Sequence, residues 1–390
     1  MGPHHHAPPG LGEPAFFAHS HGAATRSGAP ESQRLHLAGT VLPEGDVREL
    51  WLVDGVVRTE PVADAVTVAT GAWITPGLVD AHCHIGLDSR GGVDRPTAEA
   101  QARTDRNAGT LLIRDAGSPI DTHWIDAEPE LPRIIRAGRH IARTARYIRN
   151  YAVEIEPDAL LAEVERQGRA GDGWVKLVGD WIDRDAGDLT PLWPADLAAA
   201  AIERAHQVGA RVTAHCFGEE SVYQLVRAGI DGIEHGTGLD DSTIALMAER
   251  QVALVPTLIN LENFPMYADA GEPKFPRYAA HMRALYARRL ETIGKAIDAG
   301  VPVFAGTDAG GTVPHGSLAT EIGLLAGVST TEYALGAASW RSRAWLGAPG
   351  ALTDGAWADL VVYDADPRAD VTVTRRPRLV ILRGRVVDRT

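Results

Sequence analysis

The segment that most constrains the fold runs from Trp73 to His84 and reads Trp-Ile-Thr-Pro-Gly-Leu-Val-Asp-Ala-His-Cys-His. Its apolar run has the texture of a buried strand, and it ends in His82 and His84. Because side chains alternate between the two faces of a strand, these two imidazoles point the same way at its carboxyl end. Two imidazoles on one face supply half of a metal site, although this spacing also occurs by chance. The rest of the sequence is needed to choose between a metal site and a chance spacing.

A repeating strand-then-helix pattern follows this segment. The predicted strands cover residues 77–82, 110–115, 133–137, 174–178, 211–215, 232–235, 252–256 and 301–308. Helical periodicity separates most of them, at 158–170, 194–208, 219–228, 240–250 and in a long helix that ends near residue 299. Eight strands alternating with helices predict an α/β protein with a (β/α)8 TIM barrel, the catalytic domain, over residues 73–349.

Short β-type runs separated by turn residues flank this region on both sides. They fill residues 35–72 and return in residues 350–390. Neither end can bury a sheet face alone, so we predict one small β-sandwich domain built from both chain termini. Residues 1–34 are rich in Pro, Gly and His without hydrophobic periodicity, which predicts a flexible N-terminal arm.

The net charge and the cysteine content limit which kinds of partner and which location we expect. The formal net charge is −13 and no run of Lys and Arg occurs, so neither nucleic acid nor an anionic membrane is expected as a partner. We expect a small-molecule substrate and leave a homo-oligomer open. The two cysteines, Cys83 and Cys216, do not suggest a disulfide framework, and no apolar run is long enough to span a membrane. A cytoplasmic location fits this composition.

Polar side chains gather at the carboxyl ends of five predicted strands. These are His82 and His84 after the first strand, Lys176 on the fourth, His215 on the fifth, His235 on the sixth and Asp308 on the eighth. Each has an ordinary explanation by itself, such as a core histidine or a turn aspartate. Because barrel enzymes place their chemistry at this end of the strands, their joint occurrence predicts a metal site.

With these residues in place, the chain resembles the amidohydrolase superfamily of metal-dependent hydrolases, and within it the imidazolonepropionase-like and Xaa-Pro dipeptidase (prolidase)-like branch. The matching motifs are Thr75-Pro-Gly-Leu-Val-Asp-Ala-His-Cys-His, Arg114-Asp-Ala-Gly, Val175-Lys, Ala214-His, Ile233-Glu-His-Gly, Gly306-Thr-Asp-Ala-Gly, Pro314-His-Gly and Ala358-Asp-Leu-Val-Val-Tyr. The resemblance covers the chain from about residue 35 to its end.

The resemblance implies a binuclear metal centre. Its ligands would be His82, His84 and Asp308 for the first divalent ion, His215 and His235 for the second, and Lys176 as the bridge between them. A free ammonium has no lone pair, so Lys176 would bridge as a carbamate formed with carbon dioxide. Zinc suits imidazole and carboxylate ligands, and manganese, iron or cobalt would also fit.

The same resemblance implies hydrolysis of an amide-like C–N bond in a small molecule, such as an N-acyl amino acid or a dipeptide-like compound. A hydroxide bridging the metals would be the nucleophile, and Asp308 would be the catalytic residue that moves the proton. One alternative is a mononuclear deaminase or imidazolonepropionase-like cyclic-amide hydrolase with unmodified Lys176. Lactone or carbamate hydrolysis is another. A non-catalytic scaffold is disfavoured, because every ligand position is filled.

Substrate contacts are predicted from loops at the same end of the strands. Tyr147 stands where prolidase-like members often carry a histidine, with Arg146 beside it, and Phe217 stands where they often carry a tyrosine. We predict that Tyr147, Arg146 and His315 bind substrate. Residues 260–276 are rich in Pro, Gly and acidic residues, which predicts a loop over the mouth.

Overall fold

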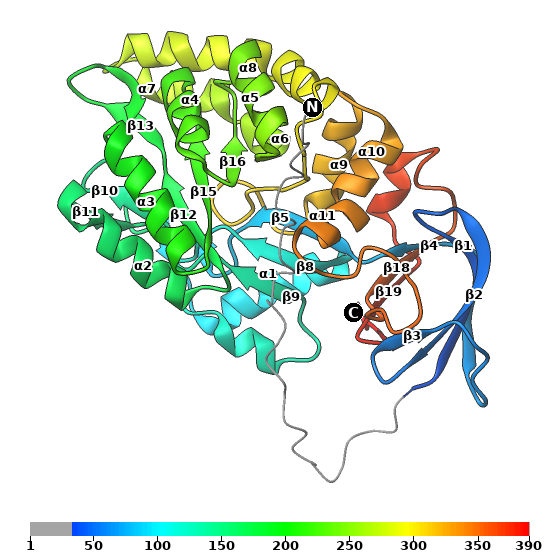
Figure 1. Cartoon of the computed structure of the whole chain (residues 1–390). Coiled ribbons are helices and arrows are strands. Elements are labelled where there is room, and N and C mark those ends of the chain that lie inside the picture. Colours follow the sequence, from blue (N-terminus) through cyan, green and yellow to red (C-terminus); the bar gives the residue numbers. More distant parts are fainter. Residues whose placement is uncertain (1–32, 390) are drawn as a thin grey trace, which may run out of the picture.

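The structure is a computed structural model, and it describes residues 33–389 of the chain. The predicted N-terminal arm therefore lies outside the described residues except for its last two. Figure 1 shows parallel strands flanked by helices in most of the molecule and a separate β-rich region, coloured blue and orange-red, at the other end. The predicted α/β class is confirmed.

Two parallel sheets form the centre of the larger region. One has six strands in the order β11-β10-β12-β15-β16-β17, and the other has three in the order β5-β8-β9. Their bounds are β5 (Leu78–Cys83), β8 (Thr110–Asp115), β9 (Arg133–Arg136), β10 (Ile141–Arg143), β11 (Val153–Ile155), β12 (Trp174–Val178), β15 (Arg211–Cys216), β16 (Gly232–His235) and β17 (Ala253–Val255). Except in the edge strand β11, residues on both faces of these strands are mostly buried, which explains their apolar runs. Two short hairpins, β6 (Leu87–Asp88) with β7 (Gly91–Gly92) and β13 (Asp180–Asp183) with β14 (Asp188–Pro191), follow β5 and β12.

Helices follow most strands, near the predicted positions. They are α1 (Arg95–Asn107), α2 (Leu160–Ala170), α3 (Ala195–Gln207), α4 (Glu219–Ala228), α5 (Asp241–Arg250), α6 (Leu258–Leu261), α7 (Phe264–Gly271), α8 (Pro276–Asp298), α9 (Leu318–Ala326), α10 (Thr331–Ala337) and α11 (Trp340–Trp345). Asp240 caps α5 by accepting a hydrogen bond from the Thr243 amide, and Gly229 ends α4 with a φ of 90°. The prediction of a plain loop at residues 260–276 was wrong, because α7 occupies the middle of it and α6 and α8 reach into its two ends.

The predicted eighth strand, residues 301–308, does not form a regular strand. The segment pairs only through isolated bridging, as between Leu254 and Val303, and the Thr307 amide donates to the Asp80 carboxylate instead of continuing a backbone ladder. It nevertheless joins the two sheets: the Phe304 amide donates to the Leu254 carbonyl at 3.0 Å, and the Asp308 amide donates to the His82 carbonyl at 2.7 Å. The closed eight-stranded barrel stays a prediction.

The β-rich region is one seven-stranded sheet in the order β20-β19-β18-β4-β1-β2-β3. Its strands are β1 (Leu35–Val41), β2 (Asp46–Val53), β3 (Val56–Arg58), β4 (Val66–Pro76), β18 (Leu360–Tyr363), β19 (Leu379–Leu382) and β20 (Arg385–Val386). Because β4 pairs with β1 on one side and β18 on the other, both ends of the described chain share this sheet. The sandwich architecture and the domain boundaries stay predictions.

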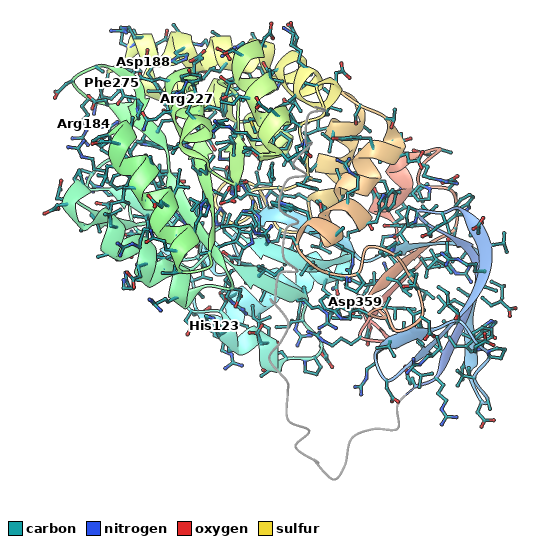
Figure 2. All side chains as sticks on the ribbon, in the orientation of Figure 1. His123, Arg184, Asp188, Arg227, Phe275 and Asp359 are labelled. Carbon is teal, nitrogen blue, oxygen red and sulfur yellow. The ribbon has the colours of Figure 1, made fainter. Side chains whose placement is uncertain are left out.

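A buried carboxylate connects this sheet to the parallel strands. Asp359, labelled in Figure 2, precedes β18 and accepts hydrogen bonds from Arg133 Nε of β9 at 2.8 Å and from the Arg383 amide at 2.7 Å. Among residues 33–389, no helix is long and apolar enough to cross a membrane. The two cysteines are buried and unpaired.

Candidate active site

Three of the predicted ligands converge where β5 meets the segment after residue 301. The Oδ1 atom of Asp308 lies 3.2 Å from His82 Nε2 and 3.0 Å from His84 Nε2. The two Nε2 atoms are 3.2 Å apart. One ligand atom from each residue therefore lies within 4.8 Å of the others, a spacing that one metal ion could span.

The other ring nitrogen of each β5 histidine is already engaged. His82 Nδ1 lies 2.7 Å from Glu234 Oε2, and His84 Nδ1 lies 2.6 Å from the Gly117 carbonyl oxygen, to which it donates. Each Nδ1–H therefore leaves a lone pair on Nε2, the atom that faces Asp308. Metal-ligating histidines are oriented in this way by a carboxylate or carbonyl, so the residues present fit a divalent cation.

The remaining predicted ligands lie beside this group. The rings of His215 and His235 have centroids 4.7 Å apart, and His235 lies 5.4 Å from His82. Lys176 Nζ is 3.5 Å from His82 Nε2. His215 Nε2 is buried without a hydrogen-bond partner among the described residues. All six predicted ligands therefore gather in one place, contributed by β5, β12, β15, β16 and the segment ending at Asp308.

Burial shifts the pKa of Lys176. Its side chain is enclosed, and loss of hydration lowers the pKa of the amine, although the carboxylates of Glu234 and Asp308 act in the opposite direction. A neutral amine is the form that reacts with carbon dioxide to give a carbamate. The environment of Lys176 thus suits the predicted modification better than an exposed lysine would.

The backbone at the site is held in an unusual conformation. His235, Thr257 and Asp308 have φ angles of 68°, 46° and 60°, in the left-handed region that residues with a Cβ rarely adopt. Such strain costs roughly 1–3 kcal/mol per residue and tends to occur at functional sites. At His235 it bends the end of β16, and His235 Nδ1 then lies 2.7 Å from Thr257 Oγ1.

Beneath the histidines lies a buried charge pair that the sequence did not reveal. Glu234 bonds His82, accepts a hydrogen bond from Arg114 Nη2 at 2.5 Å, and is also bonded by the Thr213 hydroxyl. Burial alone would raise the pKa of Glu234, but the charge of Arg114 and the hydrogen bond from His82 hold it well below its usual range. Strand alternation places Glu234 opposite His235, so the motif itself gave no reason to expect both at one site.

A cavity of about 430 Å³ opens above these residues. Its floor includes His84, His215 and Asp308. Its walls are largely aromatic and include Tyr147, Trp181, Phe217, Tyr267, Phe275 and Tyr278. Several rings contact the candidate ligands directly: the centroid of His215 lies 4.3 Å from Phe217 and 5.4 Å from Trp181. A substrate at the floor would therefore be enclosed by aromatic surface.

The three predicted substrate contacts differ in position. Tyr147 lines the cavity, whereas Arg146 does not. Arg146 is directed at the β13–β14 hairpin, with Nη1 2.8 Å from Asp183 and Nη2 donating to the Trp181 carbonyl at 3.1 Å. His315 lies apart from the cavity lining, with Nδ1 2.8 Å from Asp105 Oδ2.

Two further residues near the site were not singled out from the sequence. Asn260 donates from Nδ2 to Asp308 Oδ2 at 2.7 Å and fixes that carboxylate. His140 is buried, with its ring 5.7 Å from His84 and 5.5 Å from Tyr147, and burial lowers its pKa well below the usual value. Neither residue belongs to a spacing pattern, so only the fold brings them here.

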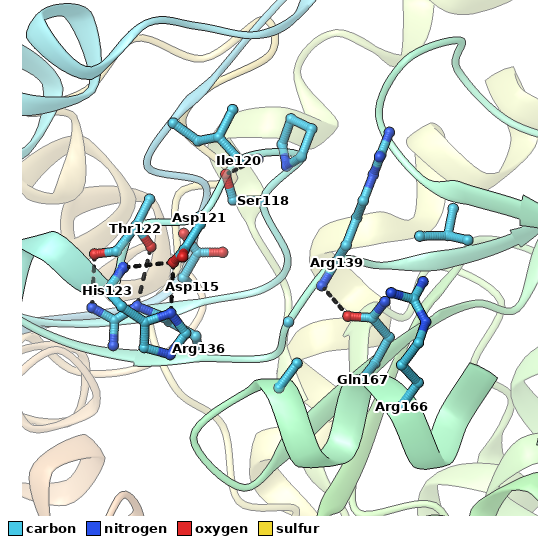
Figure 3. A pocket seen from close by; sticks show the side chains of 14 residues that line it. Asp115, Ser118, Ile120, Asp121, Thr122, His123, Arg136, Arg139, Arg166 and Gln167 are labelled. Carbon is cyan, nitrogen blue, oxygen red and sulfur yellow. Dashed lines mark hydrogen bonds and ion pairs between the residues drawn. The ribbon is translucent and has the colours of Figure 1, made fainter. Parts of the chain in front are cut away.

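A second cavity, shown in Figure 3, lies beside β9 and has a volume of about 340 Å³. It is lined by Arg136, Arg139 and Arg166, but their guanidinium groups are occupied. Arg136 pairs with Asp126 and Asp172, Arg139 donates to backbone carbonyls, and Arg166 pairs with Glu163. None of the six predicted ligands lines this cavity, so we place the candidate site at the aromatic one.

Comparisons with known proteins identify the family of this chain. The model of the amidohydrolase family matches residues 73–387. An uncharacterized protein of Mycobacterium tuberculosis is 58% identical over 354 residues, which cover 90% of this chain and 95% of the relative. Ochratoxinase of Aspergillus niger is 28% identical over 225 residues, covering 56% of this chain and 46% of that enzyme.

Solved structures show the same fold. A Xaa-Pro dipeptidase with bound methionine superposes with a TM-score of 0.75 at 20% identity, over 91% of this chain and 99% of the dipeptidase. The structure of A. niger ochratoxinase gives a TM-score of 0.73 at 20% identity, over 92% of this chain and 96% of that enzyme. The resemblance predicted from the motifs is confirmed.

Proposed function

The chain belongs to the amidohydrolase family, and from this premise we propose that it hydrolyses an amide-like C–N bond in a small molecule with the help of two divalent metal ions. The observation that carries the proposal is the convergence of the Nε2 atoms of His82 and His84 on the Asp308 carboxylate, with each Nδ1 engaged elsewhere. Side chains held in this way are prepared to bind a cation.

The proposed ligands keep the roles implied by the resemblance. His82, His84 and Asp308 would hold one ion, His215 and His235 the other, and carboxylated Lys176 would bridge them. The grouping of these side chains and the lowered pKa of Lys176 support this arrangement. Zinc is the proposed metal, because imidazole and carboxylate are ligands that suit it.

The ions would supply an acidified water molecule and a polarised scissile carbonyl. Asp308 would accept the proton of the attacking water and pass it to the leaving nitrogen. Its carboxylate suits this role, because Asn260 orients Oδ2 while Oδ1 faces the histidines. Glu234 would keep His82 in the correct tautomer, and Tyr147 would contact the substrate from the cavity wall.

The remaining expectations enter as parts of the same proposal. The two parallel sheets and residues 301–308 would form the (β/α)8 barrel, with the termini forming the smaller domain. The partner would be a small-molecule substrate rather than nucleic acid or a membrane. We also propose a cytoplasmic location, which the unpaired, buried Cys83 and Cys216 support.

Metal content per chain tests the binuclear proposal. The protein should be truncated before residue 30, because histidines in that segment could bind metal and distort the count, and it should be produced with zinc and bicarbonate. We expect two ions per chain in the parent protein and a loss of at least one in Lys176→Ala. Lys295→Ala is the matched control, since Lys295 is exposed on α8 and should leave the metal content unchanged.

One metal ion in both the parent protein and Lys176→Ala would contradict the bridged centre. It would favour the mononuclear deaminase or cyclic-amide hydrolase, which the compact group of His82, His84 and Asp308 also suits. A panel of N-acyl amines, cyclic amides, heterocyclic amines, carbamates and lactones then separates the reactions. Hydrolysis of the acyclic amides is the result expected from our proposal.

A further inference from the structure

The side chains of the cavity above the candidate metal ligands indicate what kind of substrate fits, whereas the ligands themselves do not. Its walls are formed by aromatic side chains from three separate parts of the chain: Tyr147 before β11, Trp181 on β13 and Tyr278 on α8. Tyr147 and Trp181 pack edge to face, with ring centroids 4.8 Å apart. Such surfaces bind flat or bulky apolar groups and gain little from an anionic one.

No lysine or arginine among the described residues lines this cavity. The nearest candidate in the sequence, Arg146, is turned away, since its guanidinium contacts Asp183, the Trp181 carbonyl and the Thr190 hydroxyl. Phe275, labelled near Asp188 in Figure 2, adds another apolar group to the lining. A carboxylate bound in the upper cavity would have no cationic partner there.

Away from the floor, the polar groups of the cavity are neutral and partly engaged with one another. The Tyr267 hydroxyl lies 3.2 Å from Asn260 Oδ1 and 3.1 Å from Thr312 Oγ1. Hydroxyl and amide groups can bond a carbonyl or ether oxygen of a substrate, but they do not balance a charge. Moving an unpaired carboxylate from water into such an environment costs several kcal/mol.

We propose that this site takes a neutral, largely apolar amide and discriminates against substrates with a free carboxylate. Hydrolysis would occur at the floor, while the aromatic walls would hold an aryl or cyclic group attached to the scissile bond. This inference rests on the proposed function and narrows it, because it favours neutral N-acyl amines over N-acyl amino acids and dipeptides.

A matched pair of ligands tests the inference. N-benzoyl-2-phenylethylamine and N-benzoylphenylalanine share both rings and the scissile amide, and they differ by one carboxylate. With the metal-loaded full-length enzyme, we expect kcat/KM to be about 100-fold or more higher for the neutral compound. Calorimetric titration should show the same order in Kd, and this measurement does not require turnover.

Ile148 offers a position at which the missing cation can be introduced. It lines the cavity but is 38% exposed, so a polar side chain there should not disturb folding. In Ile148→Arg, the preference for the neutral compound should fall about fivefold, the size of a partly exposed ion pair. Ile148→Gln is the control for polarity without charge and should retain the parent preference.

The outcomes separate this inference from the proposed function. Tighter binding of the neutral compound without hydrolysis of either would support the neutral cavity and overturn the amide hydrolase. Hydrolysis of both compounds with equal kcat/KM, or a preference for the carboxylate, would overturn the inference and leave the hydrolase standing. An equal effect of Ile148→Arg and Ile148→Gln on the preference would also contradict it, because charge would then not be the deciding property.

Discussion

The floor and the walls of the candidate site are held together by different kinds of interaction. At the floor and directly beneath it, buried ionisable groups are linked to one another: Arg114 to Glu234, Glu234 to His82, and His82 to Asp308. In the walls, Trp181 and Tyr147 meet through ring contacts instead. The linked polar floor fixes where bonds can be broken, whereas the apolar walls select what is brought there.

The two regions should therefore respond differently to substitution. A change at the floor leaves a buried charge or donor without its partner, so it affects metal binding, stability and turnover together. A change in the wall alters shape and polarity at a surface that solvent or substrate can reach, so it affects selectivity first. The predictions below test this division.

The largest effect is expected from Asp308→Asn. The amide keeps the size of the side chain but cannot accept the proton of the attacking water, so kcat should fall about 10²- to 10⁴-fold. Binding of a neutral ligand to the aromatic walls, measured by calorimetry, should change little. A comparable loss of ligand affinity would show that floor and walls are not separate.

A smaller effect on turnover, but a larger one on folding, is expected from Glu234→Gln. Arg114 would remain fully buried without a carboxylate, which should lower the free energy of unfolding by about 3–5 kcal/mol. His82 would also lose its orienting anion, so metal affinity should fall about 10- to 100-fold. Thermal denaturation and chelator competition measure the two quantities. An unchanged metal affinity would contradict the orienting role of Glu234.

The smallest effect is expected at His281, which supports the β13–β14 hairpin that carries Trp181. His281 on α8 bonds Asp188 of the β13–β14 hairpin and Glu219 of α4, both at 2.9 Å, and hydrogen bonding to Glu219 is the main cause that raises its pKa to about 9. Because the folded-state pKa exceeds the ordinary value of about 6.5, the stabilisation is complete below pH 6.5 and is lost as the pH rises through 9.

Replacement of His281 by Gln should remove this pH dependence. At pH 6.5 we expect the variant to be about 1 kcal/mol less stable than the parent, given the partial exposure of the histidine, and at pH 9.5 the two should be alike. Denaturant titration at both values measures the difference. A constant gap across this range would mean that His281 contributes packing rather than charge.

Much of the floor could be predicted from the chain alone. Strand alternation placed His82 and His84 on one face, and the strand-end rule placed Lys176, His215 and Asp308 at the same edge. Glu234 was not predicted, because strand alternation sends it away from His235, yet in the structure both side chains lie beside His82. Periodicity also overstated the regularity of residues 301–308, where the Thr307 amide bonds the Asp80 side chain rather than a neighbouring strand.

The side chains that form the wall were less predictable from the sequence. The sequence identified Tyr147 as a departure from the prolidase-like pattern, but not that Arg146 beside it turns toward Asp183. A charged residue next to a site is compatible with either a contact or a solvated loop, and no periodicity distinguishes them. The direction of Arg146 depends on the β13–β14 hairpin, which approaches it only after the chain has folded.

The sequence by itself determined the α/β class, the positions of most of the parallel strands and their helices, and the six predicted ligands that gather in one place, because these depend on local periodicity and on where strands end. Tertiary structure alone decided which charges are paired and which surfaces remain apolar. Hydrogen bonds such as that between Arg114 and Glu234 join residues distant in the chain, and the polarity of a cavity depends on which side chains turn into it.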